Sequence, residues 1–279
     1  MKTAQEYQKR LQRHLDELKW LYCELYPGRE DMFTQLCEQM EAWYQERPES
    51  EKKLDREREQ EPAWYSRQDM LGMMLYIDAF AGNLKGVKKK LPYLEACNVN
   101  YLHLMPFLDT PKGKSDGGYA VADYRKVQPA LGTMEELASL CSACHEKKMS
   151  VCMDFVMNHT SEDHEWAKRA LAGEKEYQDR YFFYDTPDIP QEFEKTVPQV
   201  FPTTAPGNFT WREECQKYVM TSFYPYQWDL NYSNPVVFNE MVYNMLYLVN
   251  QGIDIVRIDA VPYIWTVSYT HLTLPTNSR

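Results

Sequence analysis

The ten residues Gly252 to Val261, GIDIVRIDAV, say most about this chain. The stretch is rich in Ile and Val, which favours a buried strand. Because side chains at positions i and i+2 of a strand point to the same face, Arg257 and Asp259 are expected side by side. A buried guanidinium beside a carboxylate is costly unless the pair is used or well bonded, and it would keep the carboxylate ionised, as a carboxylate nucleophile requires. This stretch alone supports a structural ion pair and a catalytic carboxylate equally.

Composition limits the kind of protein. The chain has 279 residues, of which 44% are hydrophobic, enough for a sizeable core in one large domain or two smaller ones. Its formal net charge of −10 argues against nucleic acid as a partner. No apolar run approaches the ~18 residues of a membrane helix, so no membrane span is expected. Composition leaves the oligomeric state open.

The seven cysteines are odd in number and follow no secretory signal, so we expect reduced thiols in a cytoplasmic protein. Cys141 and Cys144 form a CxxC pair inside a helical pattern with no second pair, which favours helix packing over a zinc or redox site. No cage of acidic loop residues demands calcium. We therefore expect neither a metal nor an organic cofactor.

Residues 1–65 are predicted to form a helical N-terminal region. Apolar residues recur at spacings of three and four from Tyr7 to Leu25, and a second helix is predicted from about Asp31 to Gln45. The charged stretch from Glu49 to Gln60 is predicted as a weaker third helix. The run Glu51 to Glu61, which mixes both signs of charge, is expected to be a solvated helix face or a linker.

From about Leu71 the pattern changes to strands alternating with helices, which predicts an α/β fold with a parallel sheet. The predicted strands are Met73–Phe80, Val99–Leu104, Ser150–Phe155 and Ile253–Ile258, and the predicted helices are Asn83–Cys97 (broken near Pro92), Thr133–Lys148 and Asn234–Gln251. About 70 residues rich in Tyr, Phe, Trp and Pro separate the third strand from the next helix, and so long an irregular segment is unusual unless it is functional.

Three polar segments follow the ends of predicted strands, where a βα barrel has its active site. KSDGGY at 114–119 contains a carboxylate and a phenol on either side of two glycines, which permit a tight turn. DFVMNH at 154–159 adds an imidazole, and the fourth strand ends in RID at 257–259. A carboxylate, an aromatic face, an imidazole and an arginine-held carboxylate suit a neutral polyhydroxylated ring.

These motifs, in this order, resemble the α-amylase superfamily, glycoside hydrolase family 13, and within it most closely the amylosucrases. DFVMNH and GIDIVRIDAV resemble the first and second conserved regions, and YQWDLNYSNP at 226–235 resembles the region between them. KSDGGYAVADYRKVQPALGT at 114–133 is amylosucrase-like almost throughout. The resemblance implies a partial (β/α)8 TIM barrel over residues 66–265, comprising strands one to four with a domain B insertion at about 160–225, after the helical region 1–65.

The resemblance also implies roles for individual residues. Asp259 would be the nucleophile that forms a covalent glucosyl-enzyme, and Arg257 would orient it and keep it ionised. His159 would hydrogen-bond the glucosyl ring, Tyr119 would stack beneath it, and Asp116 would help to close the bottom of the same subsite.

Asp154 and Asn158 would support the site from within the barrel. The implied substrates are sucrose and α-glucan, with glucose passed to an α-glucan or to water. Three alternatives stay open: a sucrose hydrolase, an α-amylase or α-glucosidase acting on malto-oligosaccharides, and a non-catalytic carbohydrate-binding protein.

The final residues depart from the family pattern. A retaining glycosidase also needs an acid/base carboxylate, and the family supplies it from a glutamate after strand five. The sequence therefore predicts that the 279-residue chain alone is inactive. Its last residues, TVSYTHLTLPTNSR, resemble a translated sequencing adapter, so we expect residues 266–279 to be a non-native tail.

Overall fold

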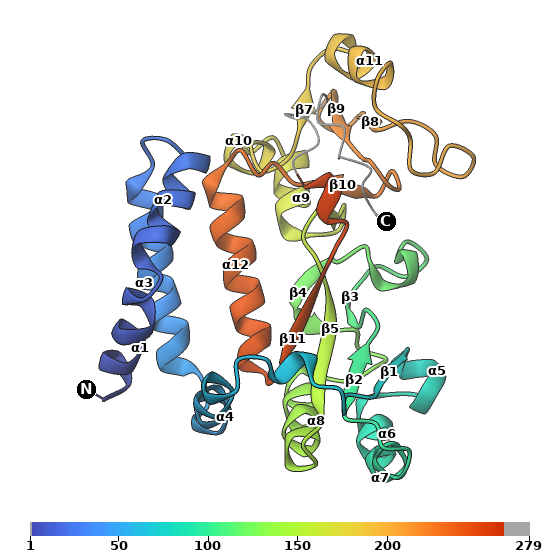
Figure 1. The fold of residues 1–279 in the computed structure, drawn as a ribbon. Helices are drawn as coiled ribbons and strands as arrows, with labels where there is room; N and C mark the ends of the chain where they lie inside the picture. The colour runs from blue at the N-terminus through green and yellow to red at the C-terminus, as the bar shows by residue number, and fades with distance from the viewer. Residues whose placement is uncertain (1, 265–279) are drawn as a thin grey trace. The chain divides into compact units, whose positions relative to one another are not determined.

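The computed structural model describes residues 2–264 and contains a four-stranded sheet in the order β1-β2-β5-β11 (Figure 1). Its strands are β1 (Gly72–Leu75), β2 (Tyr101–Leu104), β5 (Ser150–Val156) and β11 (Ile255–Asp259). β1 pairs in parallel with β2, and β2 pairs in parallel with β5. Helices connect these strands along the chain, so the predicted α/β fold with a parallel sheet is confirmed.

The connecting helices begin close to where the sequence predicts. They are α6 (Leu84–Lys89) with α7 (Leu91–Ala96), α8 (Met134–Glu146) and α12 (Pro235–Asn250). Thr133 Oγ1 accepts from the Glu136 amide at 3.3 Å, and Asn234 Oδ1 accepts from the Val236 amide at 3.0 Å. Both side chains therefore cap orphan amides of a first helical turn.

α8 packs tightly against the start of the GIDIV segment. Cys141 and Cys144 on this helix are fully buried. Gly252 has a φ of +100°, and a Cβ there would lie 2.7 Å from the Cys141 Cβ. The CxxC pair therefore has the packing environment that its helical pattern predicts, and the glycine is needed for the close approach.

Two strand predictions are wrong in part. The predicted strand Met73–Phe80 ends at Leu75, and residues Ile77–Ala81 form helix α5. MMLYIDAF has an almost continuous apolar run, and such a short run does not distinguish a strand from a helix. The predicted buried strand around Arg257 is β11, in which Arg257 and Ile258 are exposed. β11 is an edge strand of the described sheet, so only β5 flanks it there.

Four helices precede the sheet: α1 (Lys2–Gln12), α2 (Leu15–Leu25), α3 (Glu30–Glu46) and α4 (Glu49–Gln60). The helix predicted to run from Tyr7 to Leu25 is interrupted at residues 13–14. Its apolar spacing continues across the break because α1 and α2 both pack against α3.

Hydrogen bonds join these helices to α12, which stands beside them in Figure 1. The Tyr22 hydroxyl donates to Asn239 Oδ1, and Asn239 Nδ2 donates to the Met32 carbonyl, both at 3.0 Å. Arg47 Nη1 donates to the Val249 carbonyl at 3.0 Å. The N-terminal helices are therefore bonded to the helix that leads into β11.

The chain divides into two units, each with its own internal contacts. In the described part of the chain, the first unit comprises residues 2–108, 124–155 and 238–257, and the second comprises residues 109–123, 156–237 and 258–264. The second unit contains the antiparallel pair β6 (His159–Ser161) and β10 (Gln227–Asp229) and the sheet β7 (Phe183–Tyr184), β9 (Lys217–Met220), β8 (Phe209–Arg212). It also contains helices α9 (Glu165–Leu171), α10 (Lys175–Gln178) and α11 (Asp188–Glu194).

The segment expected to be irregular therefore contains short strands and helices, but more than half of its residues lie in the loops between them. The division at residues 65 and 265, the domain B insertion at about 160–225 and the non-native tail stay predictions. Residues 266–279 lie outside the described part of the chain.

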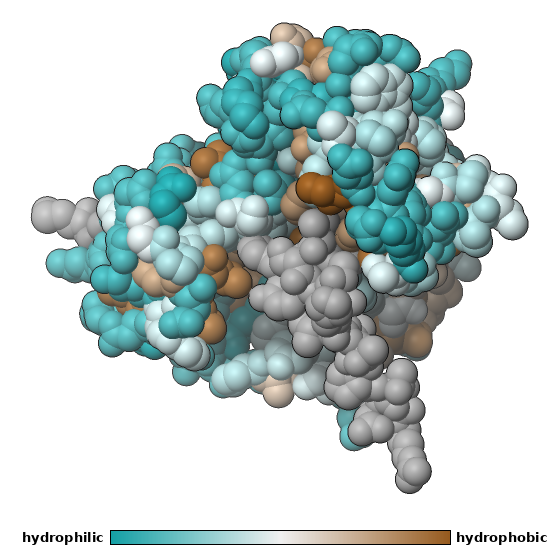
Figure 2. Space-filling model, turned by 90° about the horizontal axis from the view of Figure 1, so that it is seen from above, coloured by the Kyte–Doolittle hydropathy of each residue, from teal (hydrophilic) through white to brown (hydrophobic). Residues whose placement is uncertain are grey.

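Figure 2 shows a largely hydrophilic face on which hydrophobic residues form small separate patches. Such scattered apolar side chains are ordinary on a protein surface. None of the helices within residues 2–264 is both long enough and apolar enough to span a membrane.

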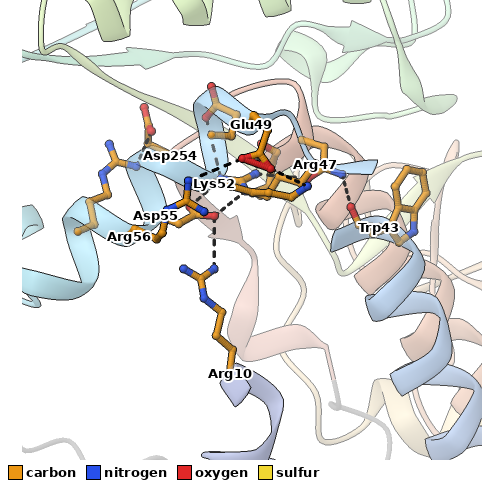
Figure 3. Close-up of polar contacts among 12 residues, drawn as sticks. Arg10, Trp43, Arg47, Glu49, Lys52, Asp55, Arg56 and Asp254 are labelled. Carbon is orange, nitrogen blue, oxygen red and sulfur yellow. Dashed lines mark hydrogen bonds and ion pairs between the residues drawn. The ribbon is translucent and has the colours of Figure 1, made fainter. Parts of the chain in front are cut away.

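α4 takes part in a network of charged side chains in the first unit (Figure 3). Arg47 donates to both carboxylate oxygens of Asp55, at 2.7 and 2.8 Å, and Arg10 lies 3.6 Å from the same carboxylate. Glu51 and Lys52 of α4 are buried. The prediction of a solvated face is therefore wrong for these two residues, because paired charges tolerate burial.

Candidate active site

The β6–β10 pair brings two sequence motifs together in the second unit. His159 of DFVMNH lies opposite Asp229, and Ser161 lies opposite Gln227 of QWDLN. All four residues are buried, with at most 3% of their surface exposed. The pairing gives a rigid two-stranded base from which polar side chains can project.

His159 is a buried, neutral imidazole. Burial lowers its pKa to about 4, although a hydrogen bond to the Tyr119 carbonyl acts in the opposite direction. Its ring lies 5.0 Å from the ring of Phe223. A neutral imidazole beside an aromatic face can exchange hydrogen bonds with uncharged hydroxyl groups.

Asp116 lies in a strained turn of the second unit. Its φ of 49° is followed by values of 66° at Gly117 and 102° at Gly118, so three successive residues are left-handed. The Tyr119 amide donates to the Asp116 carbonyl at 3.2 Å. The glycines permit this turn, as predicted, and aspartate is one of the few other residue types that adopt the left-handed region readily.

Gln227 links two of the predicted site residues. Its Nε2 lies 3.1 Å from Asp116 Oδ2 and 3.1 Å from His159 Nε2. Gln227 was not predicted as a site residue, although the YQWDLNYSNP stretch contains it. The available clue in the sequence was an amide side chain next to Trp228. In the structure Gln227 is fully buried, and a buried glutamine requires hydrogen-bond partners.

The buried carboxyl group of Asp229, opposite His159 on β10, was also not predicted. Asp229 accepts from Asn158 Nδ2 at 2.5 Å and from the Ser222 amide at 2.6 Å. Burial raises the pKa of Asp229 to about 6, against the opposing effect of these hydrogen bonds. Asn158 thus holds a neighbour of His159 in place, in keeping with the supporting role implied for it.

Arg257 contacts Asp154 in the first unit. Its Nη1 lies 2.8 Å from Asp154 Oδ1, and His103 Nε2 lies 3.3 Å from the same oxygen. Asp154 is buried, whereas 49% of the Arg257 side chain is exposed. The aspartate of DFVMNH is therefore one partner of this arginine, and the role of Arg257 toward Asp259 stays a prediction.

Asp259 ends β11 and is followed by a strained residue. Ala260 has a φ of 53°, in the left-handed region that non-glycine residues seldom adopt. The Tyr263 ring that follows lies 5.2 Å from the Phe223 ring, which in turn lies 5.0 Å from His159. Within the second unit, the segment after Asp259 therefore packs on the aromatic neighbour of His159.

A metal site has no support in the described part of the chain. Among residues 2–264, no three His, Cys, Asp or Glu side chains are grouped as metal ligands. All seven cysteines are unpaired thiols. The chemistry that these residues can perform is hydrogen bonding to hydroxyls, stacking on a ring and attack by a carboxylate.

The alpha-amylase catalytic-domain family model matches residues 40–277. The chain belongs to this family, glycoside hydrolase family 13. It is 36% identical over 185 residues to a trehalose synthase of Pimelobacter and 37% identical over 188 residues to an α-glucosidase of Apis mellifera. These alignments cover 66% of this chain but 31% and 32% of the two relatives, so the chain spans about a third of their length.

Solved structures of the family have the same fold. A family GH13_31 enzyme superposes with a TM-score of 0.63 at 28% identity, over 72% of this chain and 37% of that one. An isomaltulose synthase from Protaminobacter rubrum superposes with a TM-score of 0.61 at 26% identity, over 68% and 34%. The predicted resemblance to family 13 and the partial barrel are therefore confirmed.

Proposed function

We propose that this chain belongs to an enzyme that transfers or hydrolyses α-glucosyl groups by a retaining mechanism, with Asp259 as the nucleophile. The main support is that Asp259 stands at the end of β11 beside a strained Ala260, in a segment that contacts the aromatic neighbour of His159. Membership of family 13 supports the same reaction class.

In this mechanism an Asp259 oxygen forms a bond to the anomeric carbon while the bond from that carbon to the leaving oxygen breaks. The leaving oxygen takes a proton from a second carboxyl group, which in retaining enzymes lies ~5–5.5 Å from the nucleophile. An acceptor hydroxyl or water then attacks the anomeric carbon while the bond from that carbon to the Asp259 oxygen breaks. The acceptor oxygen gives its proton to the second carboxyl group, which had become a carboxylate in the first step. The resemblance to family 13 implies that the second carboxyl group is a glutamate after a fifth strand.

The other residues bind and orient the sugar. His159 is neutral, so it exchanges hydrogen bonds with ring hydroxyls without adding charge. Tyr119 stacks on the apolar face of the ring, and Asp116 accepts from hydroxyls at its base. Arg257, fixed by Asp154, keeps the nucleophile ionised.

For the donor we propose sucrose, with an α-glucan or water as acceptor, as in the amylosucrases. The amylosucrase-like stretch 114–133 supports this choice, and it contains both Asp116 and Tyr119. A glucose disaccharide is the second candidate, because relatives at 36% and 37% identity are a trehalose synthase and an α-glucosidase. The seven unpaired cysteines support a cytoplasmic location.

The test traps the covalent intermediate in the full-length protein. A fluorinated glucosyl fluoride, which slows the second step, should label the peptide that contains Asp259, and Asp259→Asn should abolish the label. Product analysis with sucrose, maltose and trehalose as separate donors then identifies the substrate. Binding of sugar with no label and no turnover would instead favour a carbohydrate-binding protein.

A further inference from the structure

The Gln227 side chain uses both of its N–H donors and one of its two oxygen lone pairs in hydrogen bonds. Oε1 accepts from the Tyr224 amide at 3.0 Å, while Nε2 lies 3.1 Å from Asp116 Oδ2 and 3.1 Å from His159 Nε2. The residue is 0% exposed, so these contacts are not replaced by water. One buried amide thus joins two separate loops of the second unit.

The orientation of this amide follows from its neighbours. The Tyr224 amide can only donate, so the oxygen of Gln227 must face it. A carboxylate can only accept, so the Nε2 group must face Asp116. The second hydrogen on Nε2 is then directed at His159, and turning the amide over would break both other contacts.

The same geometry sets the tautomer of His159. Its Nε2 faces an N–H donor and must carry the lone pair, so the single proton of the neutral ring belongs on Nδ1. A ring N–H also bonds the Tyr119 carbonyl. Asn158 Nδ2 lies farther away, 3.4 Å from Nδ1, and donates to Asp229 at 2.5 Å, so it does not require a lone pair on Nδ1.

We propose that Gln227 is a positioning residue that holds His159 as its Nδ1-protonated tautomer and couples it to the Asp116 carboxylate. This inference rests on the proposed function, because its kinetic effect requires both side chains to bind the sugar. The two hydrogens of one amide keep the imidazole and the carboxylate at a fixed separation. Sugar hydroxyls therefore meet a preorganised pair, which lowers the cost of ordering the site.

Two substitutions in the full-length protein test the proposal. Gln227→Met removes both donors, and we expect kcat/KM to fall by ~10- to 100-fold, as for loss of hydrogen bonds to a charged group. Gln227→Glu retains the shape and the acceptor for the Tyr224 amide, so it guards against misfolding. Gln191→Met and Gln191→Glu, at an exposed position of α11, are the matched controls and should leave kcat/KM unchanged.

The pH profile of Gln227→Glu distinguishes positioning from simple packing. The new carboxyl group faces the Asp116 carboxylate and His159 Nε2. The other nearby titratable groups are Asp229 on the same strand and Tyr226, whose pKa is raised to about 12 by burial and by Asp116. Protonation restores one donor, so the ratio of variant to wild-type kcat/KM should rise as the pH falls from 7.5 to 5. A ratio that does not change with pH would overturn the proposal.

Nitrogen-15 NMR of histidine-labelled protein provides a measurement that does not depend on activity. The His159 signals, assigned by their loss in His159→Gln, should show a protonated Nδ1 and a lone pair on Nε2, and Gln227→Glu should add a proton to the ring or shift Nε2. A proton on Nε2 in the wild-type protein would overturn the proposal. Failure of the proposed function would appear separately, as absence of the glucosyl label on Asp259.

Discussion

The guanidinium of Arg257 lies 2.8 Å from Oδ1 of Asp154, so an ion pair joins the ends of β11 and β5. Asp154 belongs to DFVMNH and Arg257 to GIDIVRIDAV, two motifs about 100 residues apart in the chain. The buried carboxylate fixes one end of the pair, while the arginine is half exposed. The arginine two residues before the proposed nucleophile is thus oriented by the strand beside it.

Asp154→Asn is expected to slow formation of the glucosyl-enzyme strongly and to lower the free energy of unfolding only slightly. The neutral amide no longer attracts Arg257, so kcat/KM should fall by ~10- to 100-fold. The free energy of unfolding should fall by only about 1–2 kcal/mol, because asparagine keeps the shape of the buried side chain and its carbonyl can still accept a hydrogen bond. Steady-state kinetics and urea unfolding of the full-length protein measure both. Asp185→Asn, at an exposed ion pair with Lys217, is the control, and a wild-type rate in Asp154→Asn would contradict the role of Arg257.

Asp254 is a buried carboxylate whose removal is expected to destabilise the first unit strongly. Its carboxylate lies 2.6 Å from Arg58 Nη1 and 2.9 Å from His145 Nε2, and it accepts from the Val151 amide at 2.6 Å. Only 1% of this side chain is exposed, and Figure 3 shows it in the polar network next to α4. It fixes the start of the GIDIV segment to the N-terminal helices.

Asp254→Ala is therefore predicted to lower the free energy of unfolding by about 3–5 kcal/mol, because it leaves Arg58 without its buried carboxylate and His145 with Glu51 alone. Urea unfolding measures the change. Lys53→Ala removes an exposed pair with Glu57 and should change the free energy by at most about 0.5 kcal/mol. Equal effects from the two substitutions would show that the buried network does not stabilise the fold.

The raised pKa of His145 predicts that the free energy of unfolding falls at alkaline pH. Burial alone would lower its pKa, but Asp254 and Glu51 outweigh this and raise the pKa to about 9. Because the folded pKa exceeds the unfolded value of ~6.5, the contribution is complete below pH 6.5 and is lost as the pH rises toward 9. The free energy of unfolding should decline over this window, and His145→Gln should remove the decline. An unchanged slope in the variant would contradict the assignment.

The sequence predicted the βα alternation because long amphipathic helices and capped helix starts carry strong local signals, as at Thr133 and Asn234. It failed where the apolar run was short and uniform, as in MMLYIDAF, whose second half is helix α5. It also failed at Arg257, since neither an edge position nor a partner on another strand is encoded by local pattern.

The candidate site shows the same limit. Motif resemblance predicted Asp116, Tyr119 and His159 as site residues, because each stands in a polar segment that follows a predicted strand. Gln227 was not predicted, because its proposed positioning role depends on contacts with Asp116 and His159, which lie 111 and 68 positions away in the chain. A buried amide acquires such a role only through tertiary structure, which a linear motif does not describe.

His164 predicts the acid side of the stability profile. It caps α9, where its Nδ1 accepts from the Trp166 amide at 3.1 Å, and burial together with Arg180 lowers its pKa to about 3. Because the folded pKa lies below the unfolded value, its contribution is complete above pH 6.5 and is lost as the pH falls, by about 3 kcal/mol between pH 6.5 and 4. His164→Asn keeps a good cap acceptor but cannot titrate, so its free energy of unfolding should vary less with pH in this window.

His159, whose pKa is about 4, also contributes less to the free energy of unfolding as the pH falls. Asp229, whose pKa is raised to about 6, contributes more as the pH falls toward 4. These two contributions remain in His164→Asn and largely cancel, so comparison with the wild-type protein isolates His164. Urea unfolding at half-unit pH steps measures the difference. Parallel curves for the two proteins would show that His164 is not held neutral in the folded state.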